Sequence, residues 1–177
     1  KKPSASRRKF LRNSLLTAAG IYIIPRHVMG RGFTAPSDRL NIAGIGAGGK
    51  GTSDIAEFFK SGRANIVALC DVDDAQAKKS REAFPKAKYY KDFRKLLEAE
   101  AKHIDAISVS TPDHTHAIIA LAAMEMGKHV YVQKPLTHDI FEARQLKESA
   151  KKYKVVTQMG NQGASGENIK KMQEWYN

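Results

Sequence analysis

From residue 40 onward the sequence alternates continuous apolar runs with amphipathic segments, and this alternation restricts the fold more than any other feature. Apolar runs of four to six residues predict buried strands at 40–45, 65–70, 87–90, 105–109, 129–132 and 155–159. Apolar residues at helical spacing predict helices over 52–60, 75–84, 93–100, 115–126, 140–153 and 167–176. Continuously apolar strands separated by helices are typical of a parallel sheet that is covered on both faces. Because such crossovers are right-handed, we expect an α/β, doubly wound sheet with the strand order 3-2-1-4-5-6.

The net charge of +12 is concentrated in the first 39 residues. They hold nine basic residues and one acidic residue, whereas the remaining 138 hold 21 basic and 17 acidic residues. The body is therefore only mildly basic, which argues against a nucleic-acid partner. A single cysteine, Cys70, excludes an internal disulfide and a Cys-rich zinc site.

Residues 6–24 have the pattern of an export signal. Arg7 and Arg8 form a twin-arginine pair, and a short apolar run follows from Leu15 to Ile24. A helix of this run is about 15 Å long, about half the thickness of the hydrocarbon core of a membrane. We therefore interpret 1–39 as a signal and linker read by the Tat machinery, with a periplasmic destination. The alternative is a basic amphipathic helix lying on a membrane surface.

A glycine-rich turn joins the first predicted strand to the first helix and fits the pattern G-x-G-x-x-G. Its residues are Gly44, Gly46, Ala47, Gly48 and Gly49. Glycines at these positions allow a tight turn and a close approach of the backbone to a pyrophosphate, which then faces the free N–H groups of the helix. The turn predicts a dinucleotide site, and the alternative is a merely flexible loop.

Asp71 ends the second predicted strand, where a carboxylate can accept both hydroxyls of an adenosine ribose. The same charge repels a 2′-phosphate, and Val72, Asp73 and Asp74 offer no compensating cation. NAD is therefore favoured over NADP. The alternative for Asp71 is a helix N-cap, the role that we expect for Asp73 and Asp74.

Two further segments leave strand ends near the predicted reversal of strand order, where such sheets bind ligands. The first contains Thr111, Pro112, Asp113, His114 and His116. No further ligand at metal spacing joins the two histidines, so we expect no metal site and assign His116 to orienting the loop. The second segment is Gln133-Lys134-Pro135, which places Lys134 in the same crevice unless it is an ordinary surface lysine.

Together these motifs resemble the N-terminal domain of the glucose-fructose oxidoreductase/inositol dehydrogenase (Gfo/Idh/MocA) family. The resemblance rests on the Gly44 turn, "CDVD" around Asp71, "STPDHTHA" at 110–117, "GKHVYVQKPL" at 127–136 and "MGNQG" at 159–163. It implies a Rossmann domain in which Lys134 lies by the nicotinamide and the substrate hydroxyl. It also implies that Asp113, His114, His116 and Asn161 contact the cofactor, Asn161 near its nicotinamide end. The sequence departs from the family at Gln133, where glutamate is usual.

The domain organisation follows from the same features. We expect a signal and linker at 1–39, an NAD-binding domain at 40–165 and, at 166–177, the start of a helix that leads into an α+β domain. That second domain lies outside this sequence, and the resemblance implies that it forms homo-oligomers. The alternative is that the protein ends at Asn177.

The function expected from the resemblance is that of an exported NAD-dependent oxidoreductase acting on a sugar, polyol or sugar derivative. Two alternatives remain open. One is an NAD-dependent glycoside hydrolase that transfers a hydride transiently and cleaves by elimination. The other is a non-catalytic sugar-binding protein with the same fold.

Overall fold

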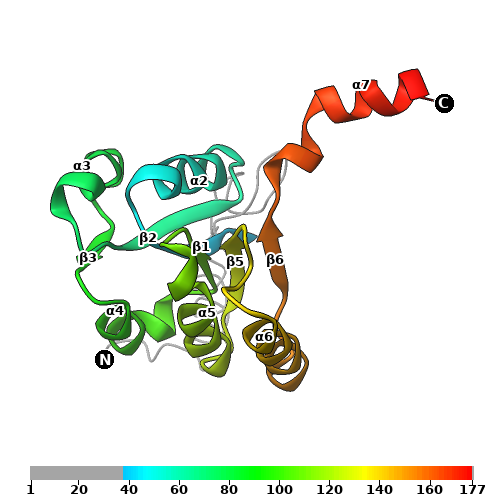
Figure 1. The fold of residues 1–177 in the computed structure, drawn as a ribbon. Coiled ribbons are helices and arrows are strands. Elements are labelled where there is room, and N and C mark those ends of the chain that lie inside the picture. The colour runs from blue at the N-terminus through cyan, green and yellow to red at the C-terminus, as the bar shows by residue number, and fades with distance from the viewer. Residues whose placement is uncertain (1–37, 177) are drawn as a thin grey trace, which may run out of the picture. The chain divides into compact units, whose positions relative to one another are not determined.

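Residues 38–176 are described by the computed structural model, and they contain a six-stranded, wholly parallel sheet (Figure 1). The strand order is β3-β2-β1-β4-β5-β6, as predicted. The strands are β1 (Leu40–Ile45), β2 (Ala64–Cys70), β3 (Lys88–Tyr90), β4 (Ala106–Val109), β5 (His129–Gln133) and β6 (Thr157–Gly160). The predicted Tat signal lies outside the described residues.

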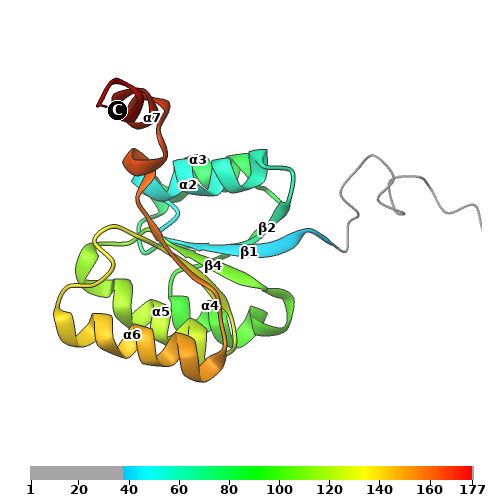
Figure 2. The same cartoon turned by 90° about the vertical axis from the view of Figure 1, so that its right-hand side faces the viewer.

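Helices cover both faces of this sheet, which confirms the doubly wound fold. Helices α2 and α3 lie on one face, and α4, α5 and α6 lie on the other (Figure 2). Their bounds are α2 (Gly49–Lys60), α3 (Asp74–Ala83), α4 (Phe93–Glu100), α5 (His116–Glu125) and α6 (Ile140–Tyr153). Within residues 38–176, no helix is long and apolar enough to cross a membrane.

The core has two parts because the sheet separates two layers of helices. Under α2 and α3, Ile55 of α2 packs with Leu69 of β2. On the other face, Leu96 of α4 and Met124 of α5 pack against Ile107 of β4. Each of these five side chains is almost completely buried, so both faces of the sheet are closed and its functional groups must lie at its edges.

The observed boundaries differ from the predicted ones mainly where strands end and helices begin. Helix α2 begins at Gly49, three residues before the predicted start, because the glycine turn itself supplies its first residues. Asp73 caps α3 by accepting hydrogen bonds from Ala75 and Gln76, so neither Asp71 nor Asp74, the first residue of the helix, is the N-cap. Gln133 was expected to follow the fifth strand, but it is the last residue of β5 and pairs with Gly160. Strand β6 runs over Thr157–Gly160 rather than 155–159.

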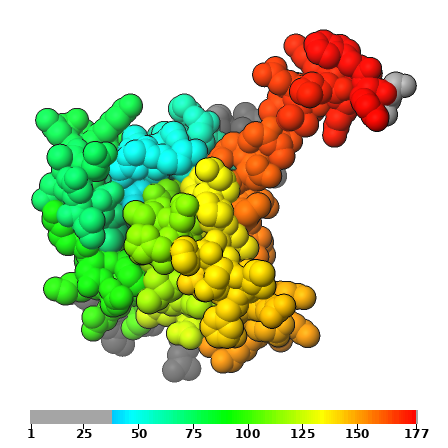
Figure 3. Space-filling model, viewed as in Figure 1, coloured from blue at the N-terminus to red at the C-terminus, as the bar shows by residue number. Residues whose placement is uncertain are grey.

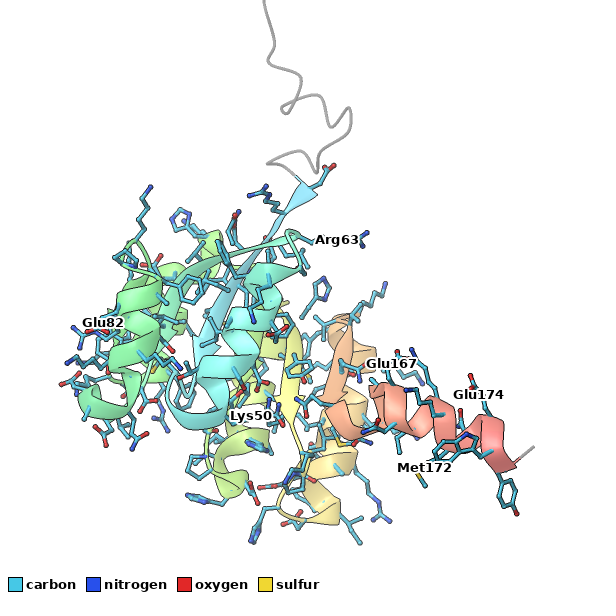
Figure 4. The ribbon with its side chains drawn as sticks, turned by 90° about the horizontal axis from the view of Figure 1, so that it is seen from above. Lys50, Arg63, Glu82, Glu167, Met172 and Glu174 are labelled. Atoms are coloured by element: carbon cyan, nitrogen blue, oxygen red, sulfur yellow. The ribbon has the colours of Figure 1, made fainter. Side chains whose placement is uncertain are left out.

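The last helix, α7 (Glu167–Tyr176), stands away from the sheet (Figure 3). None of its residues is buried, and Met172 and Glu174 are both placed on it in Figure 4. Its apolar side chains Ile169, Met172 and Trp175 are all exposed, Trp175 the most. The predicted helix is confirmed, but it contributes nothing to the core of the described domain.

Glu100, at the end of α4, is a buried carboxylate with two donors. Lys88 Nζ and Tyr90 Oη donate to its Oε1 atom at 2.7 and 2.6 Å. The Lys88 hydrogen bond, followed by that of Tyr90, lowers the pKa of Glu100 from its usual 4.5. A lowered pKa in the folded protein means that the ionised form stabilises the fold. This contribution is complete above the unfolded-state pKa and is lost as the pH falls through the folded-state pKa.

We therefore expect Glu100→Gln to lower the free energy of unfolding at neutral pH by about 1 to 3 kcal/mol, the usual effect of weakening a buried charged hydrogen bond. The difference from the unchanged protein should shrink as the pH falls below about 4.5. Denaturant unfolding at a series of pH values measures both effects. Glu98→Gln, an exposed change on the same helix, is the control. A difference that does not depend on pH would contradict this account.

Candidate cofactor and active site

The turn between β1 and α2 is packed so closely that most of its glycines are sterically required. Gly46 has a φ of +80°, and a Cβ there would lie 2.6 Å from the backbone of Ser110. A Cβ on Gly51 would lie 1.7 Å from the carbonyl oxygen of Gly46. The first turn of α2 therefore rests directly on the glycine turn, and its backbone is open to a ligand. Gly51 falls outside the G-x-G-x-x-G pattern, so that pattern does not identify it as a required glycine.

Asp71 lies beside this turn, and backbone N–H groups orient its carboxylate. Gly48 N–H donates to Oδ2 at 2.8 Å, and Asp73 N–H donates to Oδ1 at 3.0 Å. The carboxylate is only half-buried, so its remaining lone pairs face outward. This is the arrangement that a pair of ribose hydroxyls requires: a fixed anion next to the glycine turn.

A cavity of about 720 Å³ opens at this edge of the sheet. Five residues predicted from the sequence line it: Gly46, Asp71, Thr111, Pro112 and His114. Its volume suits a ligand of nucleoside size or larger. The other predicted site residues do not line it: Gly44, Ala47, Gly48, Gly49, Asp113, His116, Gln133, Lys134 and Asn161. We call the cavity with Asp71 the adenosine half of the predicted site, and the residues at the ends of β5 and β6 its second half.

Two cations outside the predicted motifs, Lys91 and Arg94, also line the cavity. Lys91 donates to the Asp74 carboxylate at 2.6 Å, and Arg94 lies 3.4 Å from that of Asp92. The Lys91 hydrogen bond lowers the pKa of Asp74. Each cation therefore already faces an acid, and Asp71 is the carboxylate that accepts a hydrogen bond from the glycine turn. The preference for NAD predicted from Asp71 is compatible with this arrangement.

The ring of His116 contacts the loop after β4 and the loop after β5, and so connects the two halves of the site. Its ring is completely buried, with Nε2 2.8 Å from the carbonyl oxygen of Thr111 and Nδ1 2.7 Å from that of Pro135. These contacts match the expectation that His116 orients the loop. They leave neither ring nitrogen free for a metal ion or for the cofactor contact that the resemblance implies. The difference arises because His116 begins α5 and points beneath the loop, whereas Asp113 and His114 are exposed on it.

Lys134 lies one residue beyond β5, and its side chain is exposed at the carboxyl edge of the sheet. The Lys134–Pro135 peptide bond is cis. Gln133 beneath it is buried, and Asn161, one residue beyond β6, is exposed. Parallel strands end at the same edge, so Lys134 and Asn161 leave neighbouring strands on the side that carries the glycine turn.

Asp54 of α2 is a further residue of the site that the sequence motifs do not identify. It is buried, and side chains from α2, β5 and the loops after β4 and β6 donate to its carboxylate. The available signal was a charged residue on the inward face of α2, which also carries Gly51 and Ile55.

A glycine turn under a helix N-terminus, an oriented carboxylate at the end of β2 and a cavity at the strand-order reversal define a dinucleotide-binding domain of the Rossmann type. The comparison of sequences is more specific. Residues 40–161 match the Gfo/Idh/MocA oxidoreductase family, NAD-binding Rossmann fold, and the chain belongs to this family. The domain therefore binds NAD.

Individual relatives include proteins with two different names. The chain is 31% identical over 153 residues to a glycosyl hydrolase family 109 protein of Shewanella sp. strain ANA-3, covering 79% of this chain and 33% of that protein. It is 28% identical over 135 residues to myo-inositol 2-dehydrogenase of Thermotoga maritima, covering 76% and 40%. A solved structure of a probable dehydrogenase from Thermotoga maritima is 31% identical with a TM-score of 0.67, covering 76% and 40%. The chain thus spans between a third and two-fifths of the length of these relatives.

Asp71 gives a direct test of the adenosine half. Asp71→Ala is expected to weaken NAD binding by about 1 to 3 kcal/mol, because it removes a charged acceptor of ribose hydroxyls. Titration of the full-length protein with NADH, followed by nicotinamide fluorescence, measures the change. Asp73→Ala removes a nearby carboxylate that caps α3, and we expect it to spare NADH affinity. Equal affinities of the unchanged protein for NAD and NADP would contradict the assignment.

Proposed function

We propose that the full-length protein is an NAD-dependent oxidoreductase that transfers a hydride between the cofactor and a sugar, polyol or sugar derivative. The observation that carries this proposal is the exposed Lys134 at the carboxyl edge, on the side of the sheet that holds the glycine turn and Asp71. Membership of the Gfo/Idh/MocA family supports the reaction type. Myo-inositol 2-dehydrogenase among the relatives supports a polyhydroxylated substrate.

The residues present divide the work between binding and proton transfer. NAD, when bound, supplies the hydride acceptor. Asp71 and the backbone of the glycine turn hold the adenosine and pyrophosphate portions. Lys134, as a free amine, accepts the proton of the substrate hydroxyl, and its flexible stem allows it to reach a substrate lying over the strand ends. Reduction in the opposite direction uses the same amine in its protonated form as the proton donor.

A second function is supported by the glycosyl hydrolase family 109 relatives. In this case the protein cleaves a glycoside after a hydride has left a sugar carbon, and the hydride then returns. The two functions differ in their net products. We would incubate the full-length protein with NAD and a panel that contains myo-inositol, free sugars and p-nitrophenyl glycosides. NADH formation at 340 nm supports the oxidoreductase, and release of nitrophenol without net NADH supports the hydrolase. If the protein binds NADH but gives neither signal with any compound of the panel, the result favours the non-catalytic alternative.

We further propose that residues 6–24 direct a folded protein to the periplasm through the Tat machinery. The support is the twin-arginine pair with its short apolar run. A protein exported in the folded state can carry NAD with it, and a cofactor that dissociated outside would not be replaced. We therefore expect the exported protein to retain NAD and to regenerate it within each catalytic cycle.

The expected result is bound NAD, about one per chain, after purification from the periplasm and extensive dialysis without added nucleotide. Acid release followed by chromatography measures it. Arg7→Lys/Arg8→Lys is the matched control, because it keeps both charges and should keep the protein in the cytoplasm. A periplasmic protein that emerges empty and works only with added NAD would overturn the retention proposal. Unchanged export of the double-lysine variant would overturn the Tat proposal.

A further inference from the structure

The strongest unexplained feature of the described domain is the buried carboxylate of Asp54. Its side chain is 5% exposed, although it lies on α2 only one turn beyond the glycine turn. Lys50 Nζ donates to Oδ1, and Gln162 Nε2 lies 3.5 Å from the same oxygen. Ser110 Oγ and Gln133 Nε2 donate to Oδ2 at 2.9 and 2.7 Å. A buried carboxylate is expensive unless it is paired and hydrogen-bonded, and Asp54 meets this condition on both oxygens.

The donors come from four separate parts of the domain. Lys50, marked in Figure 4, lies on the first turn of α2. Ser110 follows β4, Gln133 ends β5 and Gln162 follows β6. Asp54 therefore connects the helix of the glycine turn with the ends of three neighbouring strands. Ser110 begins the loop that lines the adenosine cavity, so the same carboxylate joins both halves of the site.

Gln133 transmits the position of Asp54 to Lys134. Its amide is 5% exposed and has only one orientation that satisfies its neighbours. The NH₂ group faces Asp54 at 2.7 Å, and the oxygen accepts the backbone N–H of Lys134 at 3.3 Å. A carboxylate at position 133 would place two like charges at hydrogen-bond distance, which is unfavourable unless they share a proton. Asp54 thereby favours an amide rather than an acid at this position.

We propose that Asp54 is a positioning residue for Lys134: its carboxylate orients the Gln133 amide, and through it the turn that carries the lysine. The negative charge of this part of the site then lies on Asp54 of α2. Gln133 links that carboxylate to the backbone of Lys134 through two hydrogen bonds. The inference rests on the proposed function only for its effect on turnover. Its structural part concerns the order of the turn after β5, which is measurable without any substrate.

The test compares four forms of the full-length protein: the unchanged protein, Asp54→Asn, Gln133→Glu, and the double variant that carries both substitutions. Gln133→Glu sets acid against acid, and Asp54→Asn replaces one of the two accepting oxygens with an NH₂ group that faces donors. The double variant restores a donor–acceptor pair with the charge moved from α2 to β5. Hydrogen–deuterium exchange is followed in a peptide covering 133–138, and NADH affinity is followed by fluorescence. Turnover is measured with whichever compound of the panel reacts.

We expect each single change to speed exchange in 133–138 and to lower kcat by about tenfold to a hundredfold, the range for a disrupted buried charged hydrogen bond. NADH affinity should fall by a smaller factor than kcat, because the side-chain hydrogen bonds of Asp54 go neither to Asp71 nor to residues 44–49. The double substitution should restore slow hydrogen–deuterium exchange in 133–138 and most of the lost turnover. This recovery, and the separation of kcat from NADH affinity, would not follow from general destabilisation.

The pH dependence adds a specific signature. In Gln133→Glu the two facing carboxylates repel each other unless they share a proton, so hydrogen–deuterium exchange in 133–138 should be closest to that of the unchanged protein at low pH and should become faster relative to it as the pH rises. The other titratable groups facing Asp54 are Lys50 and Tyr131. Burial raises the pKa of the Tyr131 hydroxyl, and the charge of Asp54 raises it further. The Gln133→Glu substitution alters neither Lys50 nor Tyr131, so these two groups are not a separate source of the pH dependence.

Two exposed changes are matched controls: Glu57→Gln on α2 for the loss of an acid, and Gln158→Glu on β6 for the gain of one. If Asp54→Asn does not fold, Gln133→Met removes both contacts of the amide at similar volume and should raise exchange in 133–138. The proposal is overturned if hydrogen–deuterium exchange in 133–138 is as fast in the double variant as in the single variants. It is also overturned if the single substitutions leave this hydrogen–deuterium exchange unaltered. If no compound of the panel reacts, the proposed function fails, and exchange still decides the role of Asp54.

Discussion

Replacement of Lys134 by alanine is expected to abolish measurable turnover in the full-length protein while leaving the fold intact. Proton transfer by a positioned side chain contributes about a hundredfold to ten-thousandfold to a rate. The amine of Lys50, at the same edge of the sheet, is already paired with Asp54. The side chain is exposed beyond the end of the strand, so its removal takes nothing from the core. Steady-state kinetics and a thermal unfolding curve measure the two effects.

Lys151→Ala, an exposed change on α6, is the matched control and should alter neither measurement. NADH binding provides a further check, since the adenosine half does not include Lys134. Near-normal turnover of Lys134→Ala would show that another group takes the proton and would remove the main support for the proposed mechanism. A loss of turnover together with a large fall in the unfolding temperature would point to a structural role.

Gly51→Ala is expected to have the second large effect, on both cofactor binding and stability. The added methyl would lie 1.7 Å from the carbonyl oxygen of Gly46, which is backbone and has no alternative rotamer. Either α2 or the glycine turn must move. Overpacking of this kind costs about 1 to 3 kcal/mol or more, and the displaced turn no longer presents its N–H groups correctly. We expect a clear fall in unfolding temperature and at least about a tenfold loss of NADH affinity.

Gly163→Ala is the control for this prediction, because a methyl there would meet nothing within 4 Å. It should bind NADH normally. Gly49→Ala provides a graded comparison, since the position is open but has a φ of +49° that disfavours a side chain. A Gly51→Ala variant with normal stability and NADH affinity would mean that α2 and the turn are not held as closely as the structure places them.

Several features of this protein were accessible from the sequence because they depend on neighbours along the chain. Apolar runs alternating with amphipathic segments predicted the parallel sheet and its strand order, since right-handed crossovers leave few arrangements. The position of the glycine turn between a strand and a helix predicted the dinucleotide site. Asp73 was predicted as a cap from its place before α3. Each of these inferences uses local geometry that a few consecutive residues impose.

Other features were decided only when distant segments came together. Asp54 and Gln133 are 79 positions apart, and nothing in either local pattern indicates that they form a hydrogen bond. Gly51 is required because the helix lies against the Gly46 carbonyl, and the burial of His116 depends on carbonyls at 111 and 135. A buried polar group must find its partners wherever the fold supplies them. The sequence determined which chemical groups reach the edge of the sheet, and the tertiary structure determined which of them face a ligand and which hold the others in place.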